Sequence, residues 1–138
     1  MAVLPVNPLL LKDIDLLLGS GTPDDFGAHV DAVTFTPSAT TMSWTGLKQN
    51  TFTDVSTATW TCVLNYVQDW DSTNSLSRYL YEHEGETIPA EFTPRDGGPS
   101  FTADLVITPG AIGGTVNAYA TTSVTLGCTS KPALVPAA

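Results

Sequence analysis

The stretch Thr59-Trp-Thr-Cys-Val-Leu-Asn-Tyr-Val-Gln68 runs directly into Asp69-Trp-Asp-Ser-Thr-Asn74 and then Ser75-Leu-Ser-Arg-Tyr-Leu-Tyr-Glu-His-Glu84. In its first part, Trp60, Cys62, Leu64 and Tyr66 occupy every second position. Successive side chains of a β-strand point to opposite faces, so this alternation predicts a strand with one face in the core.

The second part of this stretch predicts a short helix at about residues 74–84. Residues 69–74 are rich in side-chain oxygens that can accept the first free N–H groups of a helix. Leu76, Tyr79, Leu80 and His83 then follow at helical spacing and predict an inward face. Gly85 can adopt a positive φ and end the helix, and the expected i, i+4 ion pair is Arg78–Glu82.

The rest of the chain reads mainly as strands separated by Gly- and Pro-rich turns. Alternation predicts strands at residues 12–18, 29–36, 87–93, 100–108 and 116–128. Pro37 is expected to end the second of these, and Pro89 would be tolerated if its strand lies at a sheet edge. The predicted fold class is mainly β, a β-sandwich or partial barrel flanked by one α-helix.

A chain of 138 residues is expected to form a single domain, 1–138. Residues 1–11 and 129–138 contain prolines and apolar residues, and they predict extended arms that dock on this domain or on a neighbouring subunit. Residues 37–58 predict a long connecting loop in which 42–45 are the only convincing short strand. A loop of this length is typical of a functional or interfacial segment.

Composition narrows the function classes. The net charge of −9 argues against stable binding to nucleic acid phosphates. Only 14% of residues are charged, which favours a surface partly covered by other subunits. The N-terminal region is not typical of a signal peptide, and no apolar run is long enough to span a bilayer. Cys62 and Cys128 fall within strand patterns, and a cytosolic origin with buried, reduced thiols is favoured over a disulfide between them.

No pattern in the sequence predicts catalysis, a cofactor or a metal site. Glu82, His83 and Glu84 are consecutive, and consecutive side chains on a helix diverge by about 100°, so they cannot converge on one ion. The carboxylate pairs Asp13/Asp15, Asp24/Asp25 and Asp69/Asp71 are explained by turns and solubility. Trp44, Trp60 and Trp70 leave open a sugar-stacking site, although packing explains Trp60 and Trp70 more simply.

The order of these elements resembles the tail tube, or major tail, proteins of long non-contractile-tailed phages. The similarity lies in Lys12-Asp-Ile-Asp-Leu16 after an apolar arm, the Trp60 strand running into the helix at 75–84, and Pro89 in the next strand. It continues through Phe101-Thr-Ala-Asp-Leu-Val-Ile107, the Gly113-Gly114 turn, and Ser123-Val-Thr-Leu-Gly127 followed by Pro132. The resemblance covers most of the chain, as an arrangement of elements rather than as shared motifs.

The resemblance implies a structural virion protein that self-assembles into six-membered rings, which stack into a hollow tube for DNA ejection. The arms and the long loop would bridge to the next ring, and the family has no catalytic, cofactor or metal residues to transfer. Implied partners are other copies of the chain, tape measure and tail terminator proteins, and duplex DNA that passes without specific binding; no membrane is implied. The implied location is the virion tail, with assembly in the host cytoplasm. An acidic lumen would let DNA slide, because it repels phosphates.

Two other functions remain open from the sequence. One is a single-ring tail terminator or head–tail joining protein. The other is a surface β-sandwich that acts as an adhesion or carbohydrate-binding module.

Overall fold

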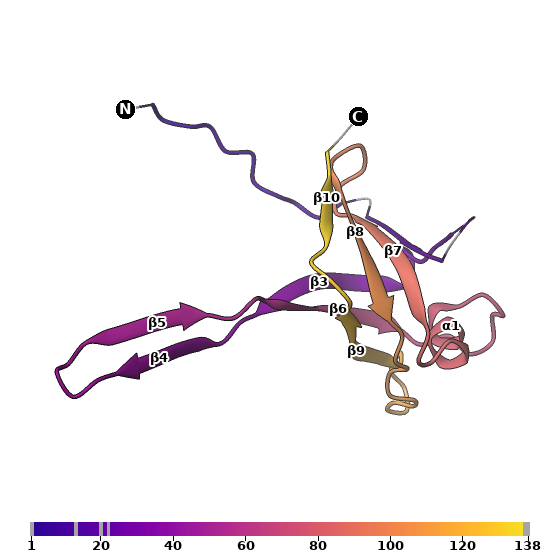
Figure 1. The fold of residues 1–138 in the computed structure, drawn as a ribbon. Helices are drawn as coiled ribbons and strands as arrows, with labels where there is room; N and C mark the ends of the chain where they lie inside the picture. The colour runs from indigo at the N-terminus through magenta and orange to yellow at the C-terminus, as the bar shows by residue number, and fades with distance from the viewer. Residues whose placement is uncertain (1, 13, 20, 22, 137–138) are drawn as a thin grey trace.

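The computed structural model describes residues 2–12, 14–19, 21 and 23–136, and it is mainly β with one helix (Figure 1). The element bounds are β1 (Asp15–Leu18), β2 (Asp24–Asp25), β3 (Val30–Ser38), β4 (Thr41–Thr45), β5 (Thr51–Val55), β6 (Thr59–Val67), α1 (Leu76–Glu82), β7 (Thr87–Thr93), β8 (Ser100–Val106), β9 (Thr121–Cys128) and β10 (Ala133–Val135).

Eight strands form one antiparallel sheet in the order β2-β1-β7-β8-β9-β6-β3, and β10 pairs with β8 beside this path. Strand β8 changes partner along its length, because Ser100–Thr102 pair with β10 whereas Leu105 and Val106 pair with β9. The sheet bends there, so that β3, β6 and β9 run across β7, β8 and β10 (Figure 1). Phe35 of β3 contacts Phe92 of β7 across the fold, with ring centroids 5.9 Å apart. The result is a partial barrel that does not close.

The core lies between the two halves of this bent sheet. On β6 the predicted inward face is confirmed, because Cys62 and Leu64 are 0% exposed and Tyr66 is buried. Ile107, directly after β8, joins the same cluster. The other strands contribute alternate apolar residues to it: Leu16, Leu18, Val33, Ala90, Phe92, Ala103, Leu105, Val124 and Leu126.

The helix forms where the sequence predicts it and covers one end of the core. Ser75 is its N-cap, and its Oγ accepts a hydrogen bond from the N–H of Arg78. Leu76 and Leu80 are fully buried and Tyr79 packs against the core, so the predicted inward face is correct. Gly85 has the predicted positive φ, 84°, and donates its N–H to Ile107 O.

The segment expected as a loop at 37–58 contains a β-hairpin instead. Strands β4 and β5 pair from Thr41↔Val55 to Thr45↔Thr51 and form a separate two-stranded sheet. The Ser-, Thr- and Asn-rich composition suggested a loop, but Thr and Phe favour strands, and Phe52 alternates with Thr51 and Thr53. The expectation that 42–45 are the only strand in this segment was therefore wrong.

Both strand prolines are accommodated by their places in the sheet. Strand β3 continues through Pro37 to Ser38, contrary to the prediction, because β3 is an edge strand and Pro37 can direct its missing N–H away from β6. Pro89 lies in β7, between β1 and β8, rather than in an edge strand. Beside Pro89, however, pairing with β1 has ended at Leu18↔Ala90, and only Gly19 N–H continues it by donating to Pro89 O.

The strand predicted at 116–128 begins at Thr121, and residues 107–120 form a long loop. Asn117 has a φ of 67°, which is incompatible with a strand, and Tyr66 Oη lies where a Cβ at Gly110 would clash. Of the residues expected in the strand at 12–18, Asp13 lies outside the described residues. No helix among the described residues is long and apolar enough to cross a membrane.

Candidate assembly surfaces

The ionisable groups of the helix end do not form a metal site. Glu82 and Glu84 are exposed, Arg78 Nε lies 3.8 Å from Glu82 Oε1 as predicted, and His83 Nδ1 lies 2.9 Å from Glu86 Oε2. Among the described residues, no three His, Cys, Asp or Glu side chains are grouped to hold an ion. The acidic helix end is therefore a solvated surface.

The two cysteines are free, as expected, and they are unsuited to nucleophilic chemistry. Burial raises the pKa of Cys62 from 9.0 to about 12, with a further contribution from Cys128. Burial also raises the pKa of Cys128. Because the thiolate is the reactive form, these raised pKa values lower the reactivity of both thiols, and most strongly that of Cys62.

In two of the three carboxylate pairs, one aspartate holds local backbone N–H groups. Asp25 Oδ1 accepts hydrogen bonds from the N–H groups of Leu16 (3.2 Å) and Gly27 (2.9 Å). Asp69 Oδ1 accepts from the N–H groups of Asp71 and Ser72, both at 3.1 Å. These bonds favour the ionised carboxylate. The pKa of Asp69 is lowered by hydrogen bonds from the side chain and the backbone N–H of Ser72, and to a smaller extent by the bond from the N–H of Asp71.

The tryptophans lie on separate elements and do not build one stacking platform. Trp44 is on β4, Trp60 is near the start of β6, and Trp70 follows the end of β6. Strand β6, which separates Trp60 from Trp70, is on the order of 20 Å long. Trp70 instead packs edge-on against Tyr81, with ring centroids 6.1 Å apart.

The N-terminal arm is extended and largely uncovered. Residues 2–11 have no regular secondary structure, and Val3, Leu4 and Val6 are 92%, 82% and 83% exposed. Figure 1 shows the arm leading away from the sheet. An apolar segment this exposed is typical of a binding surface for another chain.

The hairpin presents a second apolar surface, which we call the hairpin face: Met42, Trp44 and Phe52. These residues share one side, because Trp44 pairs directly with Phe52 and Met42 with Asp54. The Trp44 and Phe52 rings stack with centroids 6.2 Å apart, yet their side chains are 62% and 66% exposed. Figure 1 shows the hairpin extending well beyond the body of the fold.

A third apolar surface is a hollow of about 500 Å³ at the open end of the bent sheet, here called the end hollow. Of the described residues that line it, only Lys131 is charged. The others are apolar or aromatic: Leu9, Phe35, Trp60, Phe92, Pro94, Phe101, Pro132 and Leu134.

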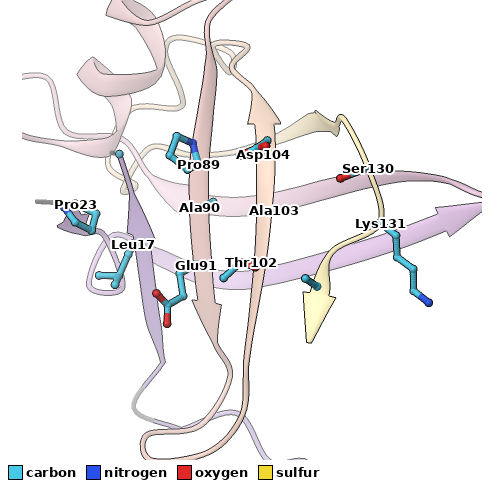
Figure 2. Close-up of a pocket in the computed structure, with 12 residues that line it drawn as sticks. Leu17, Pro23, Pro89, Ala90, Glu91, Thr102, Ala103, Asp104, Ser130 and Lys131 are labelled. Carbon is cyan, nitrogen blue, oxygen red and sulfur yellow. The ribbon is translucent and has the colours of Figure 1, made fainter. Parts of the chain in front are cut away.

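A more polar hollow of about 350 Å³ lies on the outer face of β1, β7, β8 and the segment leading into β10 (Figure 2). Pro89 and Glu91 alternate with core-facing Ala90 on β7, and the register places them beside Asp104 and Thr102 of β8. Figure 2 shows Glu91 and Asp104 on these neighbouring strands, with Lys131 at the rim. This carboxylate hollow gives one sheet face a negative character.

The fold is shared with proteins of phage-like tail particles. A chain in the tail of an empty gene transfer agent particle, determined by helical refinement with C6 symmetry, matches with a TM-score of 0.60 at 18% identity, covering 89% of this chain and 96% of that one. A chain in the virion of the native gene transfer agent particle matches with a TM-score of 0.61 at 16% identity, covering 88% and 95%. No protein-family model and no curated protein matches the chain.

At these identities the likeness establishes the fold, and at that level it confirms the resemblance to tail tube proteins. The sequence predicts an extended N-terminal arm that docks on a surface, and it missed the hairpin face and the end hollow. Phe52 could have been found from its alternation with Thr51 and Thr53 after the Gly46-Leu-Lys-Gln-Asn50 turn. The end hollow brings together residues from six separate segments, and no local pattern marks it.

Proposed function

We propose that this chain is the subunit of a phage-type tail tube. Copies assemble into stacked rings that form a conduit for DNA ejection, and the partners at the ends and inside of the tube are tail terminator and tape measure proteins. The chain belongs to the virion tail and assembles in the host cytoplasm. It acts as a structural protein and not as an enzyme.

The observation that carries this proposal is the extent of the likeness to a tail chain. The alignment takes in 96% of a chain from a helically refined tail with C6 symmetry, so the whole architecture of that chain has a counterpart here. The exposed arm and hairpin supply apolar surface outside the core, as a protein needs when its contacts are with other copies. We propose that both bridge to the next ring.

Electrostatics supports the role of conduit. The chain carries 14 acidic and five basic residues, and DNA slides past an acidic wall without being held. Glu91 and Asp104 lie together on an outer sheet face, and we assign them to the lumen.

The test of assembly is negative-stain electron microscopy of the purified protein over a range of concentrations. Long hollow tubes or stacked rings are the expected result. Single rings that never stack would favour the tail terminator alternative, and persistent monomers at high concentration would contradict both.

The lumen assignment is tested with the double variant Glu91→Lys/Asp104→Lys in assembled tails. Tubes are expected to form, whereas DNA passage is expected to slow, because the added amines bind phosphates. The matched control is Asp31→Lys/Glu84→Lys, which makes the same change of charge at two exposed positions away from this hollow. If DNA passage in the two double variants were equal, the assignment would be wrong.

A further inference from the structure

The hairpin face is already formed in the single chain. Its Trp44 and Phe52 rings are already stacked. On the opposite side of the hairpin, hydroxyl groups hold the strands together, with Ser43 Oγ 3.3 Å from Thr53 Oγ1 and Thr45 Oγ1 3.2 Å from Thr51 Oγ1. Because the face is preformed, little conformational entropy is lost on docking.

The hairpin face and the end hollow are complementary in character. One is a projecting apolar surface with a single flanking carboxylate, Asp54, which pairs with Met42. The other is an apolar hollow of about 500 Å³ whose charged lining residue is Lys131. Arg95 lines an adjoining hollow that shares Leu9, Pro94 and Phe101 with it.

This local charge pattern differs from that of the chain as a whole. Two copies with a net charge of −9 each repel one another over most approaches. The end hollow carries Lys131 and adjoins Arg95, two of the five basic residues of the chain, so it attracts a segment that carries a carboxylate. The hairpin carries one carboxylate, Asp54, on the same side as its exposed apolar residues, so it offers this hollow both an apolar surface and an opposite charge.

The two surfaces do not cover each other within one copy. Trp44 and Phe52 are mostly exposed, and the hairpin forms a sheet of its own that points away from the body (Figure 1). A contact between two different patches of identical chains is head-to-tail, and repetition of it closes a ring or extends a filament.

We propose that the hairpin face of one copy docks in the end hollow of a neighbouring copy, with Asp54 facing Lys131. This inference rests on the proposed self-assembly and adds the receiving site and the residue pair that sets the register. Trp44 and Phe52 fill the hollow, and the ion pair at its edge excludes other alignments.

The first test exchanges the charges. Asp54→Lys alone and Lys131→Asp alone are each expected to raise the concentration needed for assembly by about tenfold or more, as measured by sedimentation velocity. The double variant is expected to recover most of this loss, because the pair is restored with its polarity reversed. Asp31→Lys, the same change at an exposed position on β3, is the control and is expected to assemble like the original chain.

The second test measures proximity and does not depend on assembly strength. Phe52→Cys protein is mixed with Leu134→Cys protein under mild oxidation, and a disulfide-linked heterodimer is expected; Asp31→Cys in place of Phe52→Cys is expected to give none. If the original chain forms tubes but the charge exchange restores nothing and no heterodimer appears, the docking site is wrong while the proposed function stands. If the original chain stays monomeric, both are wrong.

Discussion

The strand β6 and the hairpin β4–β5 are built from similar alternating sequences, but β6 buries its apolar side chains whereas the hairpin exposes them. On β6, Cys62 and Leu64 are 0% exposed, whereas Trp44 and Phe52 on the hairpin are 62% and 66% exposed. Both segments have well-defined pairing. The apolar side chains of β6 are thus covered by their own chain, whereas those of the hairpin are left uncovered, as the proposed contact with another copy requires.

Thiol reactivity should show the largest contrast between the two regions. A pKa raised from 9.0 to about 12 leaves Cys62 with roughly a thousandfold less thiolate at pH 8 than an ordinary cysteine. In the Phe52→Cys variant, iodoacetamide is therefore expected to label position 52 faster than Cys62 by about two orders of magnitude or more, as followed by mass spectrometry. Comparable rates would mean that the core around β6 opens readily.

Truncating an apolar side chain should lower the free energy of unfolding much more on β6 than on the hairpin. Leu64→Ala is expected to lower the free energy of unfolding by about 2–5 kcal/mol, because it leaves a cavity in a fully buried site. Phe52→Ala, which removes a mostly exposed ring, is expected to cost less than about 1 kcal/mol. Urea denaturation of the unassembled protein measures both. Equal losses would show that the hairpin contributes to the core of its own chain.

A methyl group at Gly110 should test how tightly the body is packed. A Cβ at Gly110 would lie 2.3 Å from the Oη of buried Tyr66, so Gly110→Ala is expected to cost about 1–3 kcal/mol. Gly127→Ala, where no atom lies within 4 Å of the added Cβ, is the control and is expected to be nearly neutral. A neutral Gly110→Ala would indicate that the loop at 107–120 is loosely attached.

Deletion of residues 1–11 should affect assembly and spare the fold. The apolar arm side chains are mostly exposed, so the expected change in unfolding free energy is below about 1 kcal/mol. Stacking of rings in electron micrographs is expected to be lost. Normal polymerisation of the shortened chain would show that the arm makes no contact between rings, and the hairpin would then carry this role alone.

Acid should weaken the body slightly through Asp69. Its pKa is lowered in the folded state, mainly by hydrogen bonds from Ser72, so its contribution to stability is present above the unfolded value of 3.8 and is lost as the pH falls through the folded value. Asp69→Asn is expected to flatten the dependence of stability on pH in that acidic window. An unchanged slope would indicate that Asp69 is not hydrogen-bonded in solution.

Local sequence patterns predicted much of the body and less of the assembly surfaces. The β6 strand and the helix were predicted because their buried positions repeat at two residues and at i, i+3, i+4. The hairpin was missed because Ser, Thr and Asn serve both loops and exposed strands, and because its apolar residues have no core partner. The strand predicted from residue 116 begins only at Thr121, because the alternating pattern does not reveal the positive φ of Asn117.

The continuity of β3 and β6 with the hairpin has a mechanical consequence. Their ladder runs from Val30↔Tyr66 to Ser38↔Thr59 and leads directly into β4 and β5, joined by the Ser56 N–H bond to Thr40 O at 2.8 Å. A pull on the hairpin tip is thus directed along the strand axes, and the ladder bonds resist it together as a shear load instead of breaking one after another. A filament linked through such ribbons would bend without peeling its subunits open.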